Sequence, residues 1–362
     1  MNFWKNAFGG FYMIRTYEVV AGDTPCGPVT LKFIEIKGKY AGPTLVLVSG
    51  VHGDELSSIG GLYLFLDELA KLYGEDGIRG KILALPFANP LALMQRTWGF
   101  QLSGVSDVAL HENLNRCFPG DPTGTFGERL AHVIFTYLLG MTPDLVIDLH
   151  CMPSSSCIIV DPIAPDAVSR HSGIVLRDIT WNLAEKLGLG VVHDFPDEEY
   201  QKERLYSSLS AAFIQAGIPA CTVEVPGGPV SVAESEGIVK SVIWNAVSAR
   251  TLNIVPAEKE LYNFPVTCPN AWLSRSELGV GKYACMPGPR AEKSGFFRPL
   301  AGLAKGFCKV RKGTLIGEIL GGALEKVADV RSPVDGFLAY FSNVSMVSEG
   351  DRLCWFFVEE KK

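Results

Sequence analysis

The sequence predicts an α/β fold, in which a mixed, mostly parallel sheet has helices on both faces and a smaller all-β domain follows. Three observations support this prediction. Strand patterns alternate with helical patterns over the first two-thirds of the 362 residues. Several strand patterns are continuous runs of Leu, Val and Ile, which are typical of strands buried on both faces. After Asn253, glycines and prolines become closely spaced and helical patterns become rare. We therefore predict two domains, 1–255 and 256–362.

The first elements follow this alternation. Apolar strand patterns at Val29–Ile36, Leu45–Ser49 and Lys81–Pro86 flank an amphipathic helical pattern at Leu56–Tyr73. The segment Asn89–Gly120 is different, because it is rich in Asn, Pro, Gly and Arg and has little periodicity. We expect a long ordered loop there, and loops of this length in compact domains are usually functional.

A second series of elements begins at Thr125. Thr125 is a candidate N-cap, and Glu128 three residues later completes a capping box for a helix that extends to Leu139. The following patterns predict, in order, strands at Asp144–His150 and Cys157–Val160, helices at Asp178–Leu187 and Leu205–Ala216, a strand within Pro219–Gly228 and a closing helix at Ala233–Arg250.

Composition excludes several classes of protein. The formal net charge is −6 and no Lys/Arg-rich run occurs, so we expect no surface for nucleic acid or for an anionic membrane. No segment approaches about 18 uninterrupted apolar residues, and the first residues contain no long apolar stretch typical of a signal peptide. The nine cysteines include no C-x-x-C pair, which favours reduced thiols over a disulfide framework. These features predict a cytoplasmic protein.

Polar residues stand at the ends of three predicted strands. His52 and Glu55 follow the strand that ends at Ser49, and His150 ends the strand of sequence DLVIDLH. An imidazole and a carboxylate three positions apart can bind one Zn²⁺, which in catalytic sites commonly has three protein ligands. The H-x-x-E pattern alone is common by chance, so His150 is the candidate that would complete the site. Glu224 lies within an apolar strand, where an unpaired charge is costly.

Four motifs in this order resemble those of the succinylglutamate desuccinylase and aspartoacylase family, which is related to the zinc carboxypeptidases. They are HGDE at 52–55, LNRCFPG at 114–120, DLH at 148–150 and TVEVPGG at 222–228. The resemblance implies a zinc-carboxypeptidase-like fold for the first domain and one Zn²⁺ per chain on His52, Glu55 and His150. It also implies that Glu224 is the general base, and that Asn115 and Arg116 bind a substrate carboxylate.

One position departs from the family pattern. Aspartoacylases have an arginine directly after an Asn-Pro pair, whereas here Asn89-Pro90 is followed by Leu91. The nearest arginine is Arg96. A developing oxyanion needs a positive group besides the metal, and Arg96 is the candidate for that role.

The family resemblance implies a zinc-dependent amidohydrolase that cleaves a small N-acyl amino acid or a related N-acyl amine. The partner would be a small molecule with a carboxylate, and no nucleic acid or membrane is expected. Two alternatives stay open, a metallocarboxypeptidase acting on peptides and a non-catalytic binding protein of the same fold, and a homo-oligomer is also left open. The segment Gly313–Phe357 resembles the domains that carry biotin or lipoate, but Lys326 lacks the sequence context of a modified lysine. We expect a lid or an oligomerisation module without a cofactor there.

Overall fold

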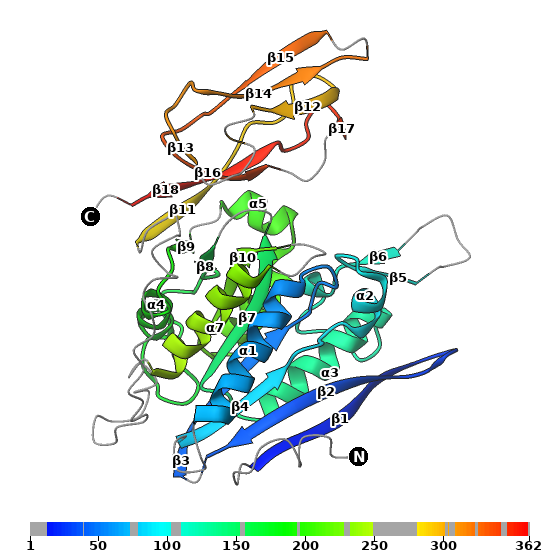
Figure 1. The fold of residues 1–362 in the computed structure, drawn as a ribbon, viewed down its shortest axis with the longest axis vertical. Coiled ribbons are helices and arrows are strands. Elements are labelled where there is room, and N and C mark those ends of the chain that lie inside the picture. The colour runs from blue at the N-terminus through cyan, green and yellow to red at the C-terminus, as the bar shows by residue number, and fades with distance from the viewer. Residues whose placement is uncertain are drawn as a thin grey trace.

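The computed structural model describes residues 13–38, 40–72, 79–102, 110–152, 156–193, 196–227, 232–248, 281–300, 303, 308–322, 325–341 and 346–360. Within them, a large α/β part stands below a smaller β part (Figure 1). This is the predicted fold class, and the prediction is confirmed.

A large mixed sheet of twelve strands, counted over the described residues, is the framework of the molecule. In spatial order the strands are β1 (Met13–Thr24), β2 (Gly27–Lys37), β4 (Arg79–Leu85), β3 (Tyr40–Ser49), β7 (Leu145–Met152), β10 (Ala220–Pro226), β8 (Cys157–Ile159), β9 (Val191–His193), β11 (Lys282–Pro287), β18 (Cys354–Glu359), β16 (Gly336–Phe341) and β13 (Cys308–Val310). The central strands β4, β3, β7 and β10 are mutually parallel. Their carboxyl ends therefore meet at one edge, where ligands of such sheets usually bind.

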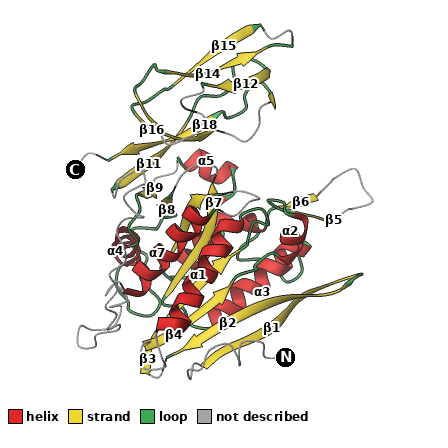
Figure 2. Ribbon diagram, viewed as in Figure 1, coloured by secondary structure: helices red, strands yellow, loops and turns green. Residues whose placement is uncertain are grey.

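Helices cover both faces of the central strands (Figure 2). On one face, α1 (Leu56–Leu72), α4 (Leu176–Lys186) and α7 (Ala233–Ser248) pack in the same apolar cluster as Leu45 and Leu47 of β3. On the other face, α3 (Phe126–Gly140) and α6 (Leu209–Gln215) pack with Val46 and Val48. Successive side chains of a strand point to opposite faces, so an unbroken apolar run is what a strand between two helical layers requires. None of the described helices combines the length and the hydropathy needed to cross a membrane.

The capping box predicted at the start of α3 is present. The Thr125 hydroxyl accepts a hydrogen bond from the backbone N–H of Glu128, and the Glu128 carboxylate accepts one from the backbone N–H of Thr125. These two bonds satisfy backbone donors that the first turn of a helix leaves without partners.

The sequence patterns missed several short elements. The expected loop at 89–120 contains α2 (Pro90–Gln95), the hairpin strands β5 (Phe100–Leu102) and β6 (Leu110–Glu112), and the 3-10 turn η3 (Leu114–Arg116). The helix expected at 205–216 is split into the turn η4 (Leu205–Ser207) and α6, and the edge strand β1, the short strand β9 and α5 (Asp197–Lys202) were not predicted. Except for β1, which has 12 residues, the missed elements have three to six residues and are too short for a hydrophobic period to reveal.

The C-terminal part is all β. A second sheet, in the order β15 (Lys326–Arg331), β14 (Leu315–Leu320), β12 (Gly295–Pro299) and β17 (Met346–Val347), shares a separate apolar core with β13, β16 and β18. The large sheet continues into this part, because β11 pairs with β9 on one side and with β18 on the other. The boundary predicted between residues 255 and 256 lies outside the described residues, so the domain division stays a prediction.

Candidate metal centre

The loop that follows β3 is fixed by its neighbours before any ligand is considered. The buried Asn89 caps the N-terminus of α2 through its side-chain oxygen, and its side-chain N–H donates to the backbone oxygen of Val51 over 3.1 Å. A Cβ at Gly53 would lie 2.0 Å from backbone atoms of Ala92, so only glycine allows this approach. The Asn-Pro pair therefore positions the loop that carries His52 and Glu55.

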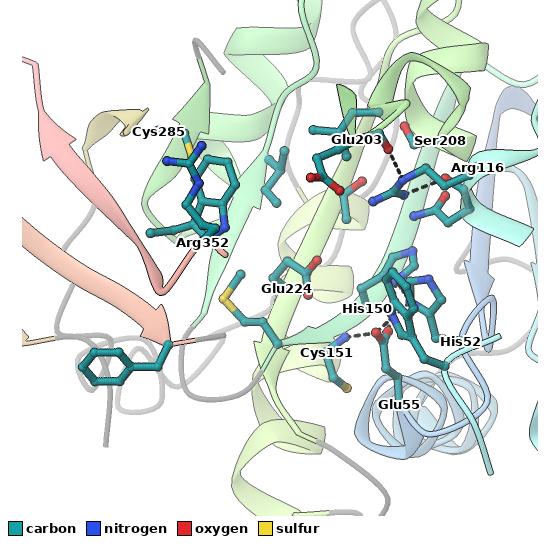
Figure 3. A pocket seen from close by; sticks show the side chains of 18 of the residues that line it. His52, Glu55, Arg116, His150, Cys151, Glu203, Ser208, Glu224, Cys285 and Arg352 are labelled. Carbon is teal, nitrogen blue, oxygen red and sulfur yellow. Dashed lines mark hydrogen bonds and ion pairs between the residues drawn. The ribbon is translucent and has the colours of Figure 1, made fainter. Parts of the chain in front are cut away.

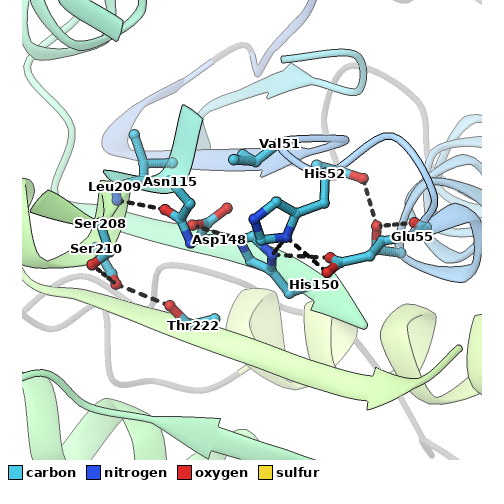
Figure 4. A network of polar contacts seen from close by, with 12 residues as sticks. Val51, His52, Glu55, Asn115, Asp148, His150, Ser208, Leu209, Ser210 and Thr222 are labelled. Atoms are coloured by element: carbon cyan, nitrogen blue, oxygen red, sulfur yellow. Dashed lines mark hydrogen bonds and ion pairs between the residues drawn. The ribbon is translucent and has the colours of Figure 1, made fainter. Parts of the chain in front are cut away.

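Three side chains from two elements converge at the carboxyl end of the sheet (Figure 4). His52 Nδ1 lies 2.7 Å from Glu55 Oε1, and His150 Nδ1 lies 2.9 Å from Glu55 Oε2. The two Nδ1 atoms are 3.1 Å apart. All three side chains are buried, and the backbone N–H of Cys151 donates to Glu55 Oε2 over 2.9 Å. The three residues are those that the sequence singled out.

The outward-facing nitrogen of each histidine has a partner that the sequence analysis missed. His52 Nε2 lies 3.1 Å from Asn113 Oδ1, and His150 Nε2 lies 2.9 Å from the fully buried Asp148 Oδ2. Such oxygen partners usually hold the outer ring N–H of a metal-binding histidine and so leave the other nitrogen available to the metal. The sequence could have indicated Asp148, because it is a charged residue inside an otherwise apolar strand.

The arrangement fits a zinc ion. The group His52, Glu55 and His150 offers one ligand atom each, all within 4.8 Å of one another. In a tetrahedral site with bonds near 2.0–2.1 Å, ligand atoms are about 3.3 Å apart, so the three side chains need to separate by only a few tenths of an ångström. Two imidazoles and one carboxylate also match the ligand set of catalytic zinc sites.

Charge interactions within the cluster are strong. Burial alone raises the pKa of Glu55, but His52 and His150 outweigh it and hold this pKa well below its usual range. Burial lowers the pKa of His150, yet the carboxylates of Asp148 and Glu55 raise it well above its ordinary value. The cluster therefore favours a positive charge at its centre, which is what a divalent cation supplies.

Glu224 lies beside this group on the neighbouring strand (Figure 3). In the parallel pair β7 and β10, Glu224 is opposite His150. Burial raises the pKa of Glu224 to about 8, while His150 opposes this shift and the carboxylates of Glu55 and Asp148 add to it. Its Oε2 atom has no hydrogen-bond partner among the described residues. The structure thus places an uncommitted carboxylate oxygen next to the candidate ligands.

Asn115 and Arg116 enter the same cavity from η3. Asn115 Oδ1 accepts a hydrogen bond from the backbone N–H of Leu209 over 3.0 Å, which orients the amide. The Arg116 guanidinium donates through Nε to the backbone oxygen of Glu203 and through Nη1 to that of Asn115, over 2.6 and 2.8 Å. Both side chains line the cavity, and these backbone contacts hold them in place.

Arg96 is placed elsewhere. It ends α2 in the left-handed backbone conformation, with φ of 53°, its side chain is exposed, and it is not among the residues that line the cavity. The cavity wall next to His52 is instead formed by Trp98, whose ring stacks on the imidazole at a centroid distance of 4.9 Å. No sequence pattern singled out Trp98.

The cavity itself has a volume of about 880 Å³ and is lined by both parts of the chain. Alongside the residues described above, Arg290, Arg352 and Trp355 of the C-terminal part contribute to its wall. Pockets for small molecules usually range from about 300 to 1,000 Å³, so this one lies toward the upper end.

Comparison with known proteins agrees with the motifs. Residues 41–241 match the model of the succinylglutamate desuccinylase/aspartoacylase catalytic domain. Over 128 residues the chain is 36% identical to the N-alpha-acetyl-L-2,4-diaminobutyric acid deacetylase of Halomonas elongata, a match that spans 35% of this chain and 34% of that protein.

Solved structures share the fold over nearly the whole chain. A succinylglutamate desuccinylase/aspartoacylase from Rhodobacter sphaeroides is 21% identical, with a TM-score of 0.70 and 96% of each chain covered. The product-bound ectoine utilization protein EutE (DoeB) of Ruegeria pomeroyi is also 21% identical, with a TM-score of 0.69 and coverage of 96% of this chain and 95% of that one. At this level of identity, the likeness shows the fold alone.

Proposed function

We propose that this chain, which belongs to the succinylglutamate desuccinylase/aspartoacylase family, is a zinc-dependent amidohydrolase that removes the acyl group from a small N-acyl amino acid or a related N-acyl amine. The observation that carries the proposal is the convergence of His52, Glu55 and His150 in one cavity with Glu224 beside them. The deacetylase activity of the Halomonas relative supports the reaction class.

We propose His52 Nδ1, Glu55 and His150 Nδ1 as the ligands of one Zn²⁺ per chain. When bound there, zinc would polarise an amide carbonyl and make a water molecule easier to deprotonate. Asn113 and Asp148 hold the outer nitrogens of the two histidines and so keep the Nδ1 atoms directed inward.

Glu224 is the proposed general base. The positive charge of a bound zinc ion would lower the raised pKa of this carboxyl, so that its free Oε2 atom could accept the proton of the attacking water and then deliver it to the nitrogen of the leaving amine. The products are a carboxylic acid and an amine. A role for Arg96 in stabilising the oxyanion stays a prediction, and its exposed position in this structure gives it no support.

Asn115 and Arg116 are proposed to bind a carboxylate of the substrate. A guanidinium offers paired N–H groups that suit a planar carboxylate, and its anchoring to two backbone oxygens reduces the entropy lost on binding. An N-acyl amino acid with a free carboxylate has the matching group.

The C-terminal residues, proposed as a separate β domain at 256–362, close one side of the cavity. A wall that includes Arg290, Arg352 and Trp355 would restrict long substrates, and this supports a deacylase over a metallocarboxypeptidase. The proposed catalytic domain is 1–255.

Metal analysis combined with a substrate panel tests the proposal. We expect about one zinc per chain, lost in His52→Ala and His150→Ala proteins. The metal-loaded wild type should hydrolyse N-acyl amino acids and should not release C-terminal residues from N-blocked peptides. Glu224→Gln should keep both zinc and fold but lose activity by about 100-fold or more. Full zinc content in both histidine variants would refute the ligand assignment, and peptide cleavage would favour the carboxypeptidase alternative.

A further inference from the structure

One end of the cavity has no role in the reaction proposed above, and its wall is apolar. Side chains from both parts of the chain line this end: Met152, Ile159, Cys285, Trp355 and Phe357. All of them belong to one apolar cluster or pack against it, and a buried free thiol behaves as a small apolar group. These residues are named the apolar end of the cavity.

The strand order places the apolar end beyond the proposed base. Next to β10, which carries Glu224, the large sheet continues with β8, β9, β11 and β18. Ile159 of β8 is directly opposite Thr222 of β10, and Cys285 of β11 is directly opposite Phe357 of β18. Residues opposite each other in an antiparallel pair share a face of the sheet, and all four of these side chains line the cavity. One face of the sheet therefore leads from the base into the apolar end.

The proposed base lies between this end and the proposed binding site for a carboxylate. Figure 3 shows Glu224 between Cys285 on one side and Arg116 on the other. In an N-acyl amino acid, the acyl group and the carboxylate lie on opposite sides of the amide nitrogen. A substrate with its carboxylate at Arg116 and its amide beside Glu224 would therefore direct its acyl group toward the apolar end.

Two arginines stand at this end, and both are held by the protein. The Arg352 guanidinium donates through Nη1 to the backbone oxygen of Gly288 over 2.8 Å and lies over the Trp355 ring, 5.3 Å from its centroid. Arg290 is exposed, and its Nη1 donates to the backbone oxygen of Gly350 over 2.8 Å. Binding of an anionic acyl group by these arginines is the alternative that a test must exclude.

We propose that the apolar end binds a hydrocarbon acyl chain longer than acetyl, so that the preferred substrates are amino acids N-acylated with a medium-length fatty acid. This inference rests on the proposed function. The cavity volume of about 880 Å³ suits a drug-sized molecule, and an N-acetyl amino acid is much smaller. A longer hydrocarbon chain would displace water from the apolar wall, and each buried CH₂ should improve kcat/KM by up to about 4-fold.

A matched series of acyl groups tests the inference. The substrates are the N-acetyl, N-hexanoyl and N-adipoyl derivatives of alanine, aspartate and lysine. The wild type should prefer hexanoyl to acetyl by at least about 10-fold in kcat/KM, because four more CH₂ groups leave water and association costs offset part of the gain. Adipoyl has the same number of carbons but ends in a carboxylate, and hexanoyl should be preferred to it by a similar factor.

Each other outcome of this series counts against a definite statement. Equal use of acetyl and hexanoyl, or a preference for acetyl, would overturn the inference while leaving the proposed function intact. A preference for adipoyl would show that the arginines bind an anionic acyl group, and this too would overturn it. Hydrolysis of none of the three derivatives would instead count against the proposed function.

Trp355→Ala removes the largest side chain of the apolar end and should reduce the hexanoyl-to-acetyl ratio of kcat/KM by at least about 5-fold, through KM for the hexanoyl substrate. Phe296→Ala is the matched control, because Phe296 of β12 is an aromatic residue of the same β part that is 42% exposed and does not line the cavity. This variant should keep the ratio. An unchanged ratio in Trp355→Ala, or an equal reduction in both variants, would contradict the inference.

The wild type alone provides a second test if the Trp355→Ala protein does not fold. The free fatty acid is a product of the preferred reaction, so hexanoate should inhibit hydrolysis at least about 10-fold more strongly than acetate or adipate does. Equal inhibition by hexanoate and acetate would contradict an apolar acyl site, and stronger inhibition by adipate would favour the arginines as an anion site.

Discussion

Replacing Asp148 with asparagine should weaken zinc binding by about 10- to 100-fold while the fold is retained. Asp148 is fully buried, and its Oδ2 lies 2.9 Å from His150 Nε2. The carboxylate fixes the imidazole tautomer in which Nδ1 is directed toward Glu55, and it raises the basicity of that nitrogen. Asparagine keeps the volume of the side chain but removes the negative charge.

The structure also predicts that loss of Asn113, the partner of His52 Nε2, weakens zinc binding less than loss of the Asp148 carboxylate does. A 10- to 100-fold change corresponds to about 1.4 to 2.7 kcal/mol. The loss of zinc affinity in Asp148→Asn should be near 100-fold, because the Asp148 side chain is charged and shielded from water. The loss in Asn113→Ala should be near 10-fold, because Asn113 is neutral, partly exposed and 3.1 Å from His52 Nε2. Asn113 Oδ1 also accepts from the backbone N–H of Asn115, so this variant should in addition raise KM.

Competition with a chromophoric chelator would measure the zinc affinities, and thermal unfolding at a fixed free zinc concentration provides an independent readout. Zinc at 1,000 times its Kd stabilises a folded protein by about 4.1 kcal/mol, and a 100-fold weaker site would keep only about 1.4 kcal/mol of this at the same concentration. The metal-free proteins serve as the reference, so that a general loss of stability is separated from lost metal binding. Unchanged zinc affinity in Asp148→Asn would refute the positioning role.

Three further predictions concern other parts of the site. Both Arg116→Lys and Arg116→Ala should raise KM, and the increase should be smaller for lysine, which keeps the charge but lacks the paired N–H groups. Esterifying the substrate carboxylate should also raise KM. Equal turnover of acid and ester by the wild type would contradict the proposed binding of a carboxylate by Arg116. Gly53→Ala should reduce zinc content and destabilise the protein by about 1–3 kcal/mol or more, because the new alanine Cβ would lie 2.0 Å from the Ala92 backbone. Metal analysis would measure the zinc content, and denaturant unfolding would measure the stability. Finally, burial raises the pKa of Asp161, which lies two residues after β8, from an ordinary value of 3.8 to about 6, so the folded state holds this proton more tightly than the unfolded chain does. The free energy of unfolding should therefore fall by up to about 3 kcal/mol as pH rises from about 4 to 6, and Asp161→Asn should flatten this dependence in urea titrations at several pH values.

The central part of the fold was predictable because its strands are extreme in composition. Leu45–Val48 and Leu145–Ile147 are apolar at every position, and only strands between two helical layers need this. The edge strand β1 was missed, because its described side chains are mostly exposed or half-buried and it has no continuous apolar run. The continuity of the large sheet into the C-terminal part was also unpredictable, because it depends on the pairing of β9 with β11, and β9 has three residues.

The candidate site was predictable where residues of metal-binding types stand at the ends of predicted strands. His52, Glu55 and His150 stand directly at or after apolar strands, and parallel strands bring such ends together. Asn113 contacts His52 from 61 positions further along the chain, so no spacing in the sequence reveals it. Asp148 lies only two positions before its partner His150 and could have been found, because the argument applied to Glu224, a charge inside an apolar strand, applies equally to it.

The shared sheet also bears on substrate size. Strand β11 is bonded to β9 of the α/β part and to β18 of the β part, so the wall that carries Arg352 and Trp355 is joined to the catalytic framework by a continuous ladder of backbone hydrogen bonds. Tilting this wall away from the cavity would break part of that ladder, and each buried backbone group left unpaired is costly. A polypeptide would meet this wall at one side of the cavity, whereas a small N-acyl amino acid would fit within the volume of about 880 Å³. The sheet connection therefore favours a cavity of fixed size, and selection among substrates then depends on the groups that line it.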